Sequence, residues 1–422
     1  MRTIPYITLL ALTSANALAQ TAPAVRNLRA TLTPVGIARG EQPQGMIVAW
    51  GCGAPYNYGQ CSVPASNTGF VAVAAGFGHT LGLKADGSIV AWGYNAFGQT
   101  NVPAPNTGFV AIATGASHSL GLKAEGSIVA WGFNCCGQTN VPAPNADFIR
   151  IAADVYHSLG LKADGSIMAW GDNYYGQTSV PAPNTGFVAV AAGFYHSLGL
   201  KADGSIVAWG RNDFGQTDVP APNADFIGIA AGGVHSLALK ADGSVVGWGY
   251  NDFGQTSVPA PNADFIGIAA GVYHSLGLKA DGSIVAWGCG SPYNYGQCSV
   301  PTPNTGFVAV AAGAAHSLGL RADRDSDGVP DGTDDCPASD VGETIVIDKC
   351  DTGIANEVSD DGCTPADAVA ACAAEARNHG QFVQCVAHLA NGWKRSGAIT
   401  DADRGRLMRC AARADIPPSN DR

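Results

Sequence analysis

The sequence predicts an all-β fold, a seven-bladed β-propeller closed by half-blades from the two ends of its repeats, followed by a small disulfide-linked α-helical module. Two observations carry this prediction. A segment of 39 residues, lengthened to 42 where a loop is inserted, recurs along most of the chain, and a fixed period of this size is typical of propellers and solenoids. Within each copy, short runs of β-branched and aromatic residues alternate with glycine-containing turns, and this alternation indicates strands.

The copy that begins at Phe70 shows the expected strands most clearly. They cover residues 70–75, 80–83 and 89–92, and Asp86-Gly87 supplies the turn between the second and the third. The segment 102–106 contains two prolines, which cannot donate to a strand ladder, so we place it at a blade edge or in a connection. Three or four short antiparallel strands in about 40 residues make one propeller blade.

One histidine and one tryptophan mark the copies. The histidines are His79, His118, His157, His196, His235, His274 and His316, and the tryptophans are Trp50, Trp92, Trp131, Trp170, Trp209, Trp248 and Trp287. Because Trp50 has no histidine before it and His316 has no tryptophan after it, the chain holds six whole repeats and two complementary halves. We therefore expect residues 307–320 to pair with residues 46–50 and to close a ring of seven blades, which removes exposed sheet edges.

A residue that recurs in every blade is more often structural than catalytic, because a catalytic site needs groups with distinct roles. We therefore expect each repeat histidine to make a turn or inter-blade hydrogen bond. The tryptophans are expected to pack blade against blade, since their large apolar area favours burial.

The wording of the copies resembles a known family. Gly-x-x-His-Ser-Leu-Gly-Leu-Lys-x-Asp-Gly-Ser-Ile-Val-Ala-Trp-Gly-x-Asn-x-x-Gly-Gln is similar to the regulator of chromosome condensation repeat, over residues 46–322. This resemblance implies the propeller fold. Residues 170–182 are also similar in wording to bacterial propellers of that family that act as secreted β-lactamase inhibitor proteins. Fold does not fix function, so neither resemblance decides the partner.

The first residues predict export. Residues 1–19 contain one arginine, an apolar run over 7–12 and a small-residue cleavage site at 17–19, as in a secretory signal, and residues 20–45 form a lead-in. We expect a secreted monomer that is periplasmic, extracellular or at the cell surface, without a membrane span. The formal net charge of −11 argues against nucleic acid as a partner.

Twelve cysteines in an exported chain predict disulfides. The two longer repeats carry the same inserted loop with a cysteine at each end, which predicts the pairs Cys52–Cys61 and Cys289–Cys298. For the adjacent Cys135 and Cys136, a vicinal disulfide and two free thiols both remain open. The connectivity of the others cannot be deduced from sequence; they are Cys336, Cys350, Cys363, Cys372, Cys385 and Cys410.

An acidic segment follows the last repeat strand and predicts a calcium loop over residues 323–336. Oxygen ligands stand at the spacing of a twelve-residue calcium loop, with glycine at its sixth position: Asp323, Asp325, Asp327, the carbonyl of Val329, Asp331 and Asp334. With Cys336 two residues further on, the segment resembles a thrombospondin type 3 repeat. The alternative is a solvated acidic linker.

The period is lost after Cys350, and residues 337–422 predict a small three-helix module held by disulfides. Thr364 followed by Pro365 is a helix start for 366–377. Residues 381–394 and 401–414 are the two other helical stretches, the last opened by Thr400 and Asp403 as a capping-box-like pair.

The copies differ mainly at one edge of the expected blades. The turns after the first and third strands share this edge, which we call the variable face, and the Lys-Ala-Asp-Gly-Ser turns after the second strand form the opposite, uniform face. The candidate partner-binding residues of the variable face are Tyr94, Phe133, Tyr156, Asp172, Tyr174, Phe194, Tyr195, Arg211, Asp213, Tyr250, Asp252 and Tyr273. Four further aromatics recur before Gly-Gln and are expected to pack inward: Phe97, Tyr175, Phe214 and Phe253.

Tyrosine, phenylalanine and arginine in turns on a rigid scaffold are typical of a protein-binding surface. The sequence therefore predicts a non-catalytic module that recognises a partner protein, and the resemblance adds inhibition of a β-lactamase or another secreted or cell-wall enzyme. The alternatives are an inert rim, a structural component of the cell surface or matrix, and a glycan-active enzyme using Asp172 or Asp213.

Overall fold

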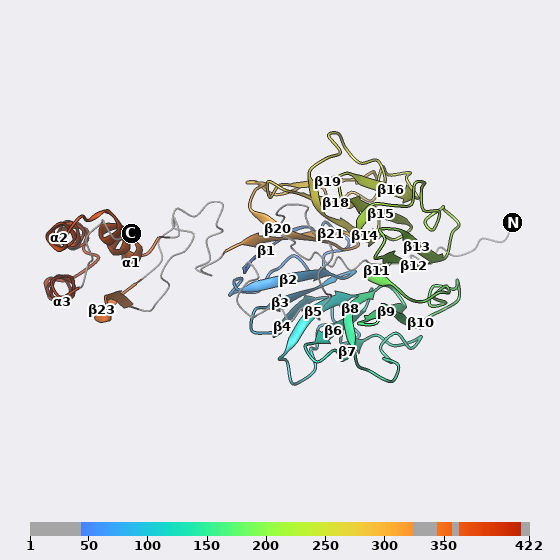
Figure 1. The fold of residues 1–422 in the computed structure, drawn as a ribbon, viewed down its shortest axis with the longest axis horizontal. Helices are drawn as coiled ribbons and strands as arrows, with labels where there is room; N and C mark the ends of the chain where they lie inside the picture. The colour runs from blue at the N-terminus through green and yellow to red at the C-terminus, as the bar shows by residue number, and fades with distance from the viewer. Residues whose placement is uncertain (1–43, 324–343, 357–362, 415–422) are drawn as a thin grey trace. The chain divides into compact units, whose positions relative to one another are not determined.

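The computed structural model describes residues 44–323, 344–356 and 363–414. The predicted signal segment and almost all of the lead-in lie outside these residues. The chain divides into two compact units, Met1–Arg321 and Ala322–Arg422, and each is described by itself. The first is built from repeated antiparallel sheets and the second mainly from helices (Figure 1).

Every copy of the repeat forms the strands that its hydrophobic runs predict. The first copy holds β2 (Phe70–Ala75), β3 (His79–Lys84) and β4 (Ile89–Gly93), whose register pairs Thr80 with Trp92. Gly87 takes φ +80° in the turn between β3 and β4, a conformation that glycine adopts without strain. These bounds match the predicted strands to within one residue at each end.

The following copies repeat this pattern as separate three-stranded sheets. Their strands are β5 (Phe109–Thr114), β6 (His118–Lys123) and β7 (Ile128–Gly132); β8 (Phe148–Ala153), β9 (His157–Lys162) and β10 (Ile167–Gly171); β11 (Phe187–Ala192), β12 (His196–Lys201) and β13 (Ile206–Gly210); β14 (Phe226–Ala231), β15 (His235–Lys240) and β16 (Val245–Gly249); and β17 (Phe265–Ala270), β18 (Ser275–Lys279) and β19 (Ile284–Trp287).

Strands from the two ends of the repeat region share one sheet. It has the order β20-β21-β1-β2-β3-β4, with β1 (Gly45–Gly51), β20 (Phe307–Ala312) and β21 (His316–Ala322). The indole of Trp50 also donates from Nε1 to the carbonyl of Gln297, at 2.9 Å. The two half-repeats therefore lie side by side, as their complementary sequences predict.

Residues 102–106, for which the sequence predicts a blade edge or a connection, form no strand, and neither do their counterparts in the other described copies. The asparagine of this segment replaces the missing strand: Asn106 accepts from the amide of Ile89 and donates to the carbonyl of Ile89, both at 2.8 Å. The same pair of bonds is made by Asn67, Asn145, Asn184, Asn223, Asn262 and Asn304. Each outer strand thus has backbone groups paired that would otherwise remain open at a sheet edge.

The repeat histidines hold neighbouring copies together. His79 Nε2 lies 3.0 Å from Ser119 Oγ of the next copy, and Ser119 donates its proton to the carbonyl of Gln99 at 2.8 Å. Because the serine proton is used in this way, the imidazole is the donor in the first bond. The indole of Trp131 donates to the same carbonyl at 2.9 Å, so one glutamine carbonyl collects two bonds between copies.

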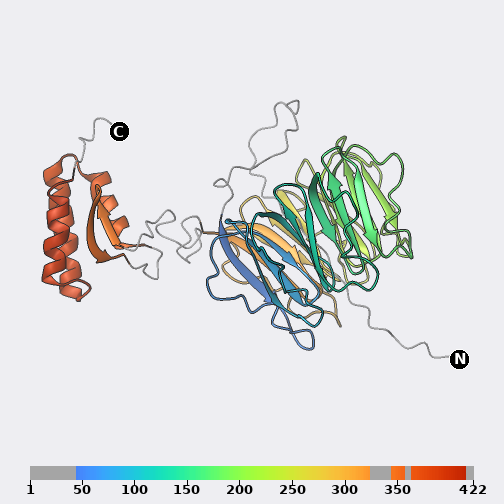
Figure 2. The same ribbon diagram turned by 90° about the horizontal axis from the view of Figure 1, so that it is seen from below.

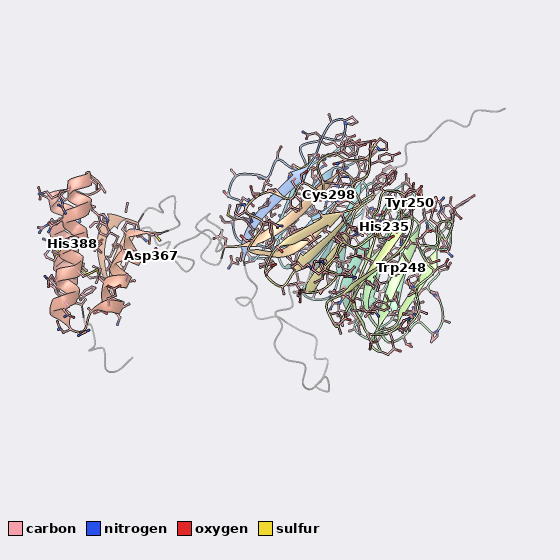
Figure 3. All side chains as sticks on the ribbon, turned by 90° about the horizontal axis from the view of Figure 1, so that it is seen from above. His235, Trp248, Tyr250, Cys298, Asp367 and His388 are labelled. Carbon is pink, nitrogen blue, oxygen red and sulfur yellow. A yellow bond between two sulfur atoms is a disulfide. The ribbon has the colours of Figure 1, made fainter. Side chains whose placement is uncertain are left out.

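This arrangement recurs at every histidine of the repeats. The further contacts join His118 to Ser158, His157 to Ser197, His196 to Ser236, His235 to Ser275, His274 to Ser317, and His316 to Thr80 of the first copy. Figure 3 labels His235 on β15 and Trp248 on the neighbouring β16. The prediction of an inter-blade hydrogen bond is confirmed. Burial lowers the pKa of each of these histidines to about 3, so they are neutral at pH 7.

The second unit contains the three predicted helices, α1 (Pro365–Glu375), α2 (His379–Ser396) and α3 (Asp401–Ala411). Thr364 and Thr400 are N-caps in complete capping boxes with Asp367 and Asp403, which confirms both helix starts. Disulfides join Cys350 to Cys410 and Cys372 to Cys385, and Cys363 is also disulfide-bonded.

The unit also contains an element that the sequence did not predict, an antiparallel hairpin of β22 (Thr344–Ile347) and β23 (Cys350–Ala355), which lies beside the three helices (Figure 2). Its turn uses Asp348 and Lys349, both at positive φ. Ile345, Ile347 and Ile354 pack from the hairpin into the core of this unit, with Phe382 and Leu407 from the helices.

Candidate functional site

The two sets of variable turns share one edge of the repeats, as predicted. The first residue after β4, Tyr94, donates its backbone amide to the carbonyl of Gly78 in the turn between β2 and β3, at 2.7 Å. The same bond is made by Phe133, Asp172, Arg211 and Tyr250 to the corresponding turns of their own copies, at 2.8 to 3.0 Å. The variable face is therefore a set of double turns, each anchored at the end of its sheet.

Each turn that follows a third strand is fixed by a buried glutamine. Gln99 has no exposed surface, and its side-chain oxygen accepts the amide of Phe97 at 2.9 Å, while Asn95 accepts the amide of Thr100 at 3.0 Å. The corresponding glutamines of the other copies are buried in the same way. The glutamine and asparagine that shape these turns vary little between copies, whereas the other side chains of the turns differ from copy to copy.

The inward packing predicted for the aromatics before Gly-Gln is wrong for three of the four. Phe97, Tyr175 and Phe214 are exposed, and Phe253 is half-buried. The reason is steric: the interior position of the turn is already filled by the glutamine two residues later, so the ring turns outward. These rings belong to the variable face.

Ring contacts join most aromatic side chains of the variable face into what we call the aromatic belt. Its centroid separations run from 4.2 to 6.4 Å, the range of favourable aromatic pairs. One arm consists of Tyr295, Tyr56, Phe77, Tyr58, Tyr94, Phe97, Phe133 and Tyr156. The other arm consists of two groups of rings that Arg211 joins, Tyr174, Tyr175, Phe194 and Tyr195 in the first and Phe214, Tyr250, Phe253, Tyr273 and Tyr293 in the second.

Arg211 bridges rings within the second arm. Its guanidinium carbon lies 5.1 Å from the ring centroid of Tyr175, 5.8 Å from that of Tyr195 and 5.6 Å from that of Phe214. Its Nε donates to Asp213 Oδ2 at 2.6 Å. Cation–π contacts with three rings hold the guanidinium against the belt.

Two of the residues that were predicted to contact a partner are buried and are not exposed on the variable face. Phe194 is 7% exposed and Tyr195 is 8% exposed. They lie in an apolar cluster formed by the turns between first and second strands, together with Phe77, Ala116, Val155, Val272 and Ala314. Because turns from several copies converge in this cluster, the largest side chains fill it and lose contact with solvent.

The other predicted contact residues remain accessible to different degrees. Tyr174 is 82% exposed, and Asp213 and Asp252 are exposed. Tyr94, Phe133, Tyr156, Asp172, Arg211, Tyr250 and Tyr273 are half-buried. A half-buried ring with one free face suits an interface, since little conformational entropy remains to be lost on binding.

The inserted cysteine loops add tyrosines to the belt that the sequence reasoning did not include. The predicted disulfides Cys52–Cys61 and Cys289–Cys298 are confirmed, and they hold Tyr56, Tyr58, Tyr293 and Tyr295 against neighbouring rings. Figure 3 labels Cys298, at the end of the second of these loops, and Tyr250 of the same face. The signal for these tyrosines was present, because both loops carry the same Pro-Tyr-Asn-Tyr wording.

Three tyrosines of the belt, Tyr195, Tyr250 and Tyr273, have raised pKa values. Burial, followed by the charge of neighbouring tyrosines, raises the pKa of Tyr273 to about 12. Burial and then a hydrogen bond to Asp252 raise the pKa of Tyr250. Burial also raises the pKa of Tyr195. Each ring can therefore donate a hydrogen bond from its hydroxyl while its face packs against an apolar group.

The two carboxylates considered for catalysis are engaged in their own turns. Asp172 accepts from Gln177 Nε2 at 2.8 Å and from the amide of Tyr174 at 3.3 Å. Asp213 is the partner of Arg211. These bonds give both carboxylates a role in shaping the variable face.

Cys135 and Cys136 occupy the turn after β7 as two exposed, unbonded thiols, with their Sγ atoms 2.6 Å apart. Cys136 stands where the other copies carry the aromatic before Gly-Gln. Within the described residues, no ring contact crosses this turn from Tyr156 to Tyr174 or Tyr175. The aromatic belt is therefore interrupted at this turn.

The calcium prediction falls mainly outside the described residues. Asp323 is buried at the end of β21, and residues 324–336 are not among those described. Within the described part of the chain, no group of three or more histidine, cysteine, aspartate or glutamate residues is placed to hold a metal ion. Across the same residues, no helix has the length and apolarity needed to cross a membrane.

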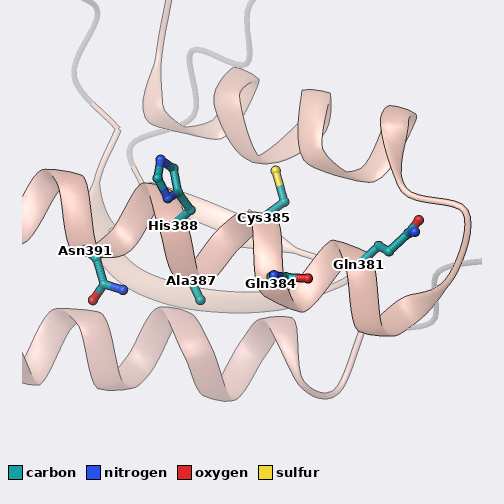
Figure 4. A pocket seen from close by; sticks show the side chains of 6 residues that line it. All are labelled: Gln381, Gln384, Cys385, Ala387, His388 and Asn391. Carbon is teal, nitrogen blue, oxygen red and sulfur yellow. The ribbon is translucent and has the colours of Figure 1, made fainter.

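The second unit carries a shallow depression on one side of α2 (Figure 4). It is lined by Gln381, Gln384, Cys385, Ala387, His388 and Asn391. Cys385 is bonded to Cys372, so it offers no nucleophile. We assign this surface no function.

The chain was compared with known families and proteins. The family model described as the regulator of chromosome condensation (RCC1) repeat matches six segments, at residues 70–99, 109–138, 148–177, 187–216, 226–255 and 265–297. Each match runs from a first strand to the glutamine of the following turn. No curated protein sequence matches the chain significantly.

Several solved structures are similar to this chain, and the two with TM-scores above 0.5 show the same fold. Prp20p from Saccharomyces cerevisiae is 20% identical, with a TM-score of 0.57 over 68% of this chain and 94% of that one. Yeast RCC1 (Prp20) from a complex with Kap60 is 20% identical, with a TM-score of 0.55 over 73% of this chain and 98% of that one. The CRINKLY ectodomain of the Arabidopsis thaliana receptor kinase ACR4 is 23% identical over 58% of this chain and 90% of that one, with a TM-score of 0.47.

Proposed function

Because the chain belongs to the regulator of chromosome condensation repeat family, whose propellers are generally protein-interaction modules, we propose that it is a non-catalytic module that recognises a partner protein. One relative of known structure, yeast RCC1 (Prp20), is bound to Kap60. We also propose that the repeats form a closed ring of seven blades. The contact of His316 with Thr80 and the placement of β1 beside β21 support this closure.

The aromatic belt on the variable face is the observation that carries the proposal. It joins half-buried and exposed rings from successive copies around an arginine that contacts three of them. Tyrosine and arginine are the residues enriched among binding hot spots, and single anchors of this kind are worth about 2 kcal/mol or more. Because the belt sits on turns anchored to rigid sheets, it is organised before a partner arrives.

The proposed partner is an exported protein, such as a β-lactamase or another secreted or cell-wall enzyme that the module inhibits. The signal-like composition of residues 1–19 supports export. The disulfides of both units also suit an oxidising compartment. The likeness to propeller-type β-lactamase inhibitors rests on the sequence of residues 170–182 alone.

The test is capture of secreted and cell-envelope proteins by the full chain, beside two matched variants. Tyr174→Ala removes a side chain that is 82% exposed on the variable face, and Ile227→Ala removes one that is 58% exposed at the opposite end of its repeat. We expect a protein that is retained by the parent and by Ile227→Ala and lost from Tyr174→Ala. Retention that is equal in all three would overturn the assignment of this face.

The inhibitory version has its own measurement. We expect the chain to slow hydrolysis of a chromogenic cephalosporin by a purified β-lactamase, and Tyr174→Ala to do so less. If the captured partner is a different enzyme, its own substrate replaces the cephalosporin. If a captured enzyme keeps its full turnover, the chain recognises that enzyme without inhibiting it. That result would favour a structural component of the cell surface over an inhibitor.

The acidic loop completes the proposal as a calcium site, with six ligand positions: Asp323, Asp325, Asp327, Val329, Asp331 and Asp334. Their spacing supports calcium over other ions, because hard oxygen ligands of this kind and number suit it. Calorimetric titration of the full chain with calcium is expected to show one site that Asp327→Asn weakens. Equal heats for the parent and the variant would contradict this ligand set.

A further inference from the structure

The adjacent thiols of Cys135 and Cys136 are the feature that the proposed function leaves unused. We propose that they form a reversible vicinal disulfide, made by exchange with a small-molecule disulfide such as oxidised glutathione. The bond would form in the turn that interrupts the aromatic belt, and its presence or absence would set the shape of the variable face there.

The geometry already brings the two sulfur atoms close together. The Sγ atoms lie 2.6 Å apart, closer than unbonded sulfur atoms normally pack. The turn is held like its counterparts, because Cys136 donates its amide to Gln138 Oε1 at 3.0 Å and Thr139 donates its amide to Asn134 Oδ1 at 3.1 Å. Both thiols are exposed, so a small disulfide can reach them.

The bond expected here differs in kind from the other disulfides of the protein. The four described disulfides span Cα separations of 5.5 to 6.3 Å, within the ordinary range of about 4.4–6.8 Å. Adjacent residues joined by a trans peptide are only about 3.8 Å apart. A disulfide between neighbours is therefore strained, and strained, exposed disulfides are reduced more readily than structural ones.

The exchange balances in two steps. The thiolate of Cys135 attacks oxidised glutathione, forms a mixed disulfide and releases one glutathione thiolate. The thiol of Cys136 then loses its proton and attacks the sulfur of Cys135, which releases the second glutathione. Two protein thiols are oxidised and one small-molecule disulfide is reduced to two thiols.

The surroundings favour this order of attack. Partial desolvation by neighbouring atoms, followed by the hydrogen bond and charge of Cys135 and the charge of Asp172, raises the pKa of Cys136 to about 12 although the thiol is exposed. Cys136 therefore stays protonated in the resting turn and suits the second, intramolecular step, where proximity compensates for a small thiolate fraction.

The position links the redox state to the variable face. Cys136 takes the place of Phe97, Tyr175, Phe214 or Phe253 in the other copies, and it lies between the two arms of the aromatic belt. A change at this turn alters the surroundings of Tyr156, whose pKa is raised by burial and then by the two thiols and Asp172, and of Asp172, whose charge acts on Cys136. This regulatory step rests on the proposed function, whereas the bond itself does not.

The test equilibrates the full chain in glutathione buffers of stepwise potential, alkylates the remaining thiols and measures peptide masses after trypsin. Cleavage after Lys123 and Arg150 isolates a peptide whose cysteines are Cys135 and Cys136. We expect both thiols to escape alkylation in oxidising buffer, and to be released at a potential at which Cys52–Cys61 and Cys289–Cys298 stay intact. Full alkylation in oxidising buffer, or opening together with those two pairs, would overturn the proposal.

Two variants separate the bond from its effect. Cys135→Ser is expected to leave Cys136 with a glutathione adduct in place of the internal bond. Cys136→Phe supplies the ring found in other copies and removes the second thiol, so only a glutathione adduct on Cys135 and no internal bond is expected. For a captured partner, we expect its Kd to differ about fivefold or more between the oxidised and reduced chain, and equal affinities would exclude the regulatory step. If the chain captures no partner, the proposed function fails and the mass measurement still decides the bond.

Discussion

The interior and the variable face of the same repeats follow opposite rules. Between the copies, one histidine, one serine or threonine, one glutamine carbonyl and one tryptophan make the same bonds each time. On the variable face, the position before Gly-Gln holds phenylalanine, tyrosine or cysteine. The difference teaches that uniform positions keep the copies together, while variable positions, borne by the same backbone, are free to specify a partner. Four predictions test this division, from the largest expected loss of stability to the smallest.

Acid is expected to cause the largest loss of stability, because it acts on the buried histidines between all the copies. The pKa of each repeat histidine is about 3 when folded and about 6.5 when unfolded. Below pH 6.5 the unfolded chain therefore binds more protons, so the stability present above pH 6.5 is lost as the pH falls toward 3. At pH 5.5 each histidine is expected to lower the free energy of unfolding by about 1.4 kcal/mol, and seven together by ~10 kcal/mol. This loss is as large as the total stability of a typical domain.

The measurement is thermal unfolding followed by circular dichroism between pH 8 and pH 4. The melting temperature is expected to be flat above pH 7 and to fall steeply between pH 6.5 and pH 5. A melting temperature that stays constant down to pH 4 would show that the histidines are not buried as neutral donors.

Removal of one tryptophan should damage a single junction. Trp209 donates to the carbonyl of Gln177 at 2.9 Å and shares an apolar cluster with Leu159 and Leu161 of the preceding sheet and with Phe187 of its own sheet. Trp209→Ala is expected to lower the free energy of unfolding in urea by about 3–5 kcal/mol, because it leaves a cavity and removes one of the two hydrogen bonds to the Gln177 carbonyl. Trp393→Ala in the second unit is the matched control, and it should leave the unfolding of the repeats unchanged.

Much of this interior was predictable from sequence because the repeat itself is the signal. The strand positions, the inter-blade role of His79 and its counterparts, and the disulfides of the inserted loops follow from comparing copies with one another. The caps at Thr364 and Thr400 follow from local hydrogen-bonding chemistry. None of these inferences needs distant contacts to be known in advance.

The features that were not predicted depend on which side chain fills a limited interior space, and a single sequence does not show this. Phe97 has the composition of a core residue, yet Gln99 fills the interior of its turn and the ring is exposed. Phe194 and Tyr195 have the composition of surface anchors, yet converging turns bury them. The hairpin of β22 and β23 escaped prediction because its turn, Asp348-Lys349, lacks the glycine that normally marks one.

The asparagines that replace a fourth strand provide a smaller test of the interior. Asn223 makes two bonds to the backbone of Ile206, at 2.7 and 2.8 Å. Asn223→Ala should lower the free energy of unfolding by about 1–2 kcal/mol, since both backbone groups of Ile206 lose a partner. Asn223→Asp keeps the acceptor and loses the donor, so its loss should be intermediate. Equal stability of all three in urea would show that water serves Ile206 equally well.

The ion pair of the variable face should contribute least to stability. Arg211 Nε and Asp213 Oδ2 lie 2.6 Å apart, with the aspartate side chain 59% exposed. Exposed pairs of this kind are worth ~0–1 kcal/mol and are screened by salt, so Asp213→Asn is expected to change the free energy of unfolding by less than about 0.5 kcal/mol. Three rings still hold the guanidinium, so Arg211→Ala should weaken partner capture far more than Asp213→Asn does. If Asp213→Asn instead unfolded the repeats in urea as readily as Asn223→Ala, the variable face would be part of the scaffold, and its variation between copies would need a different explanation.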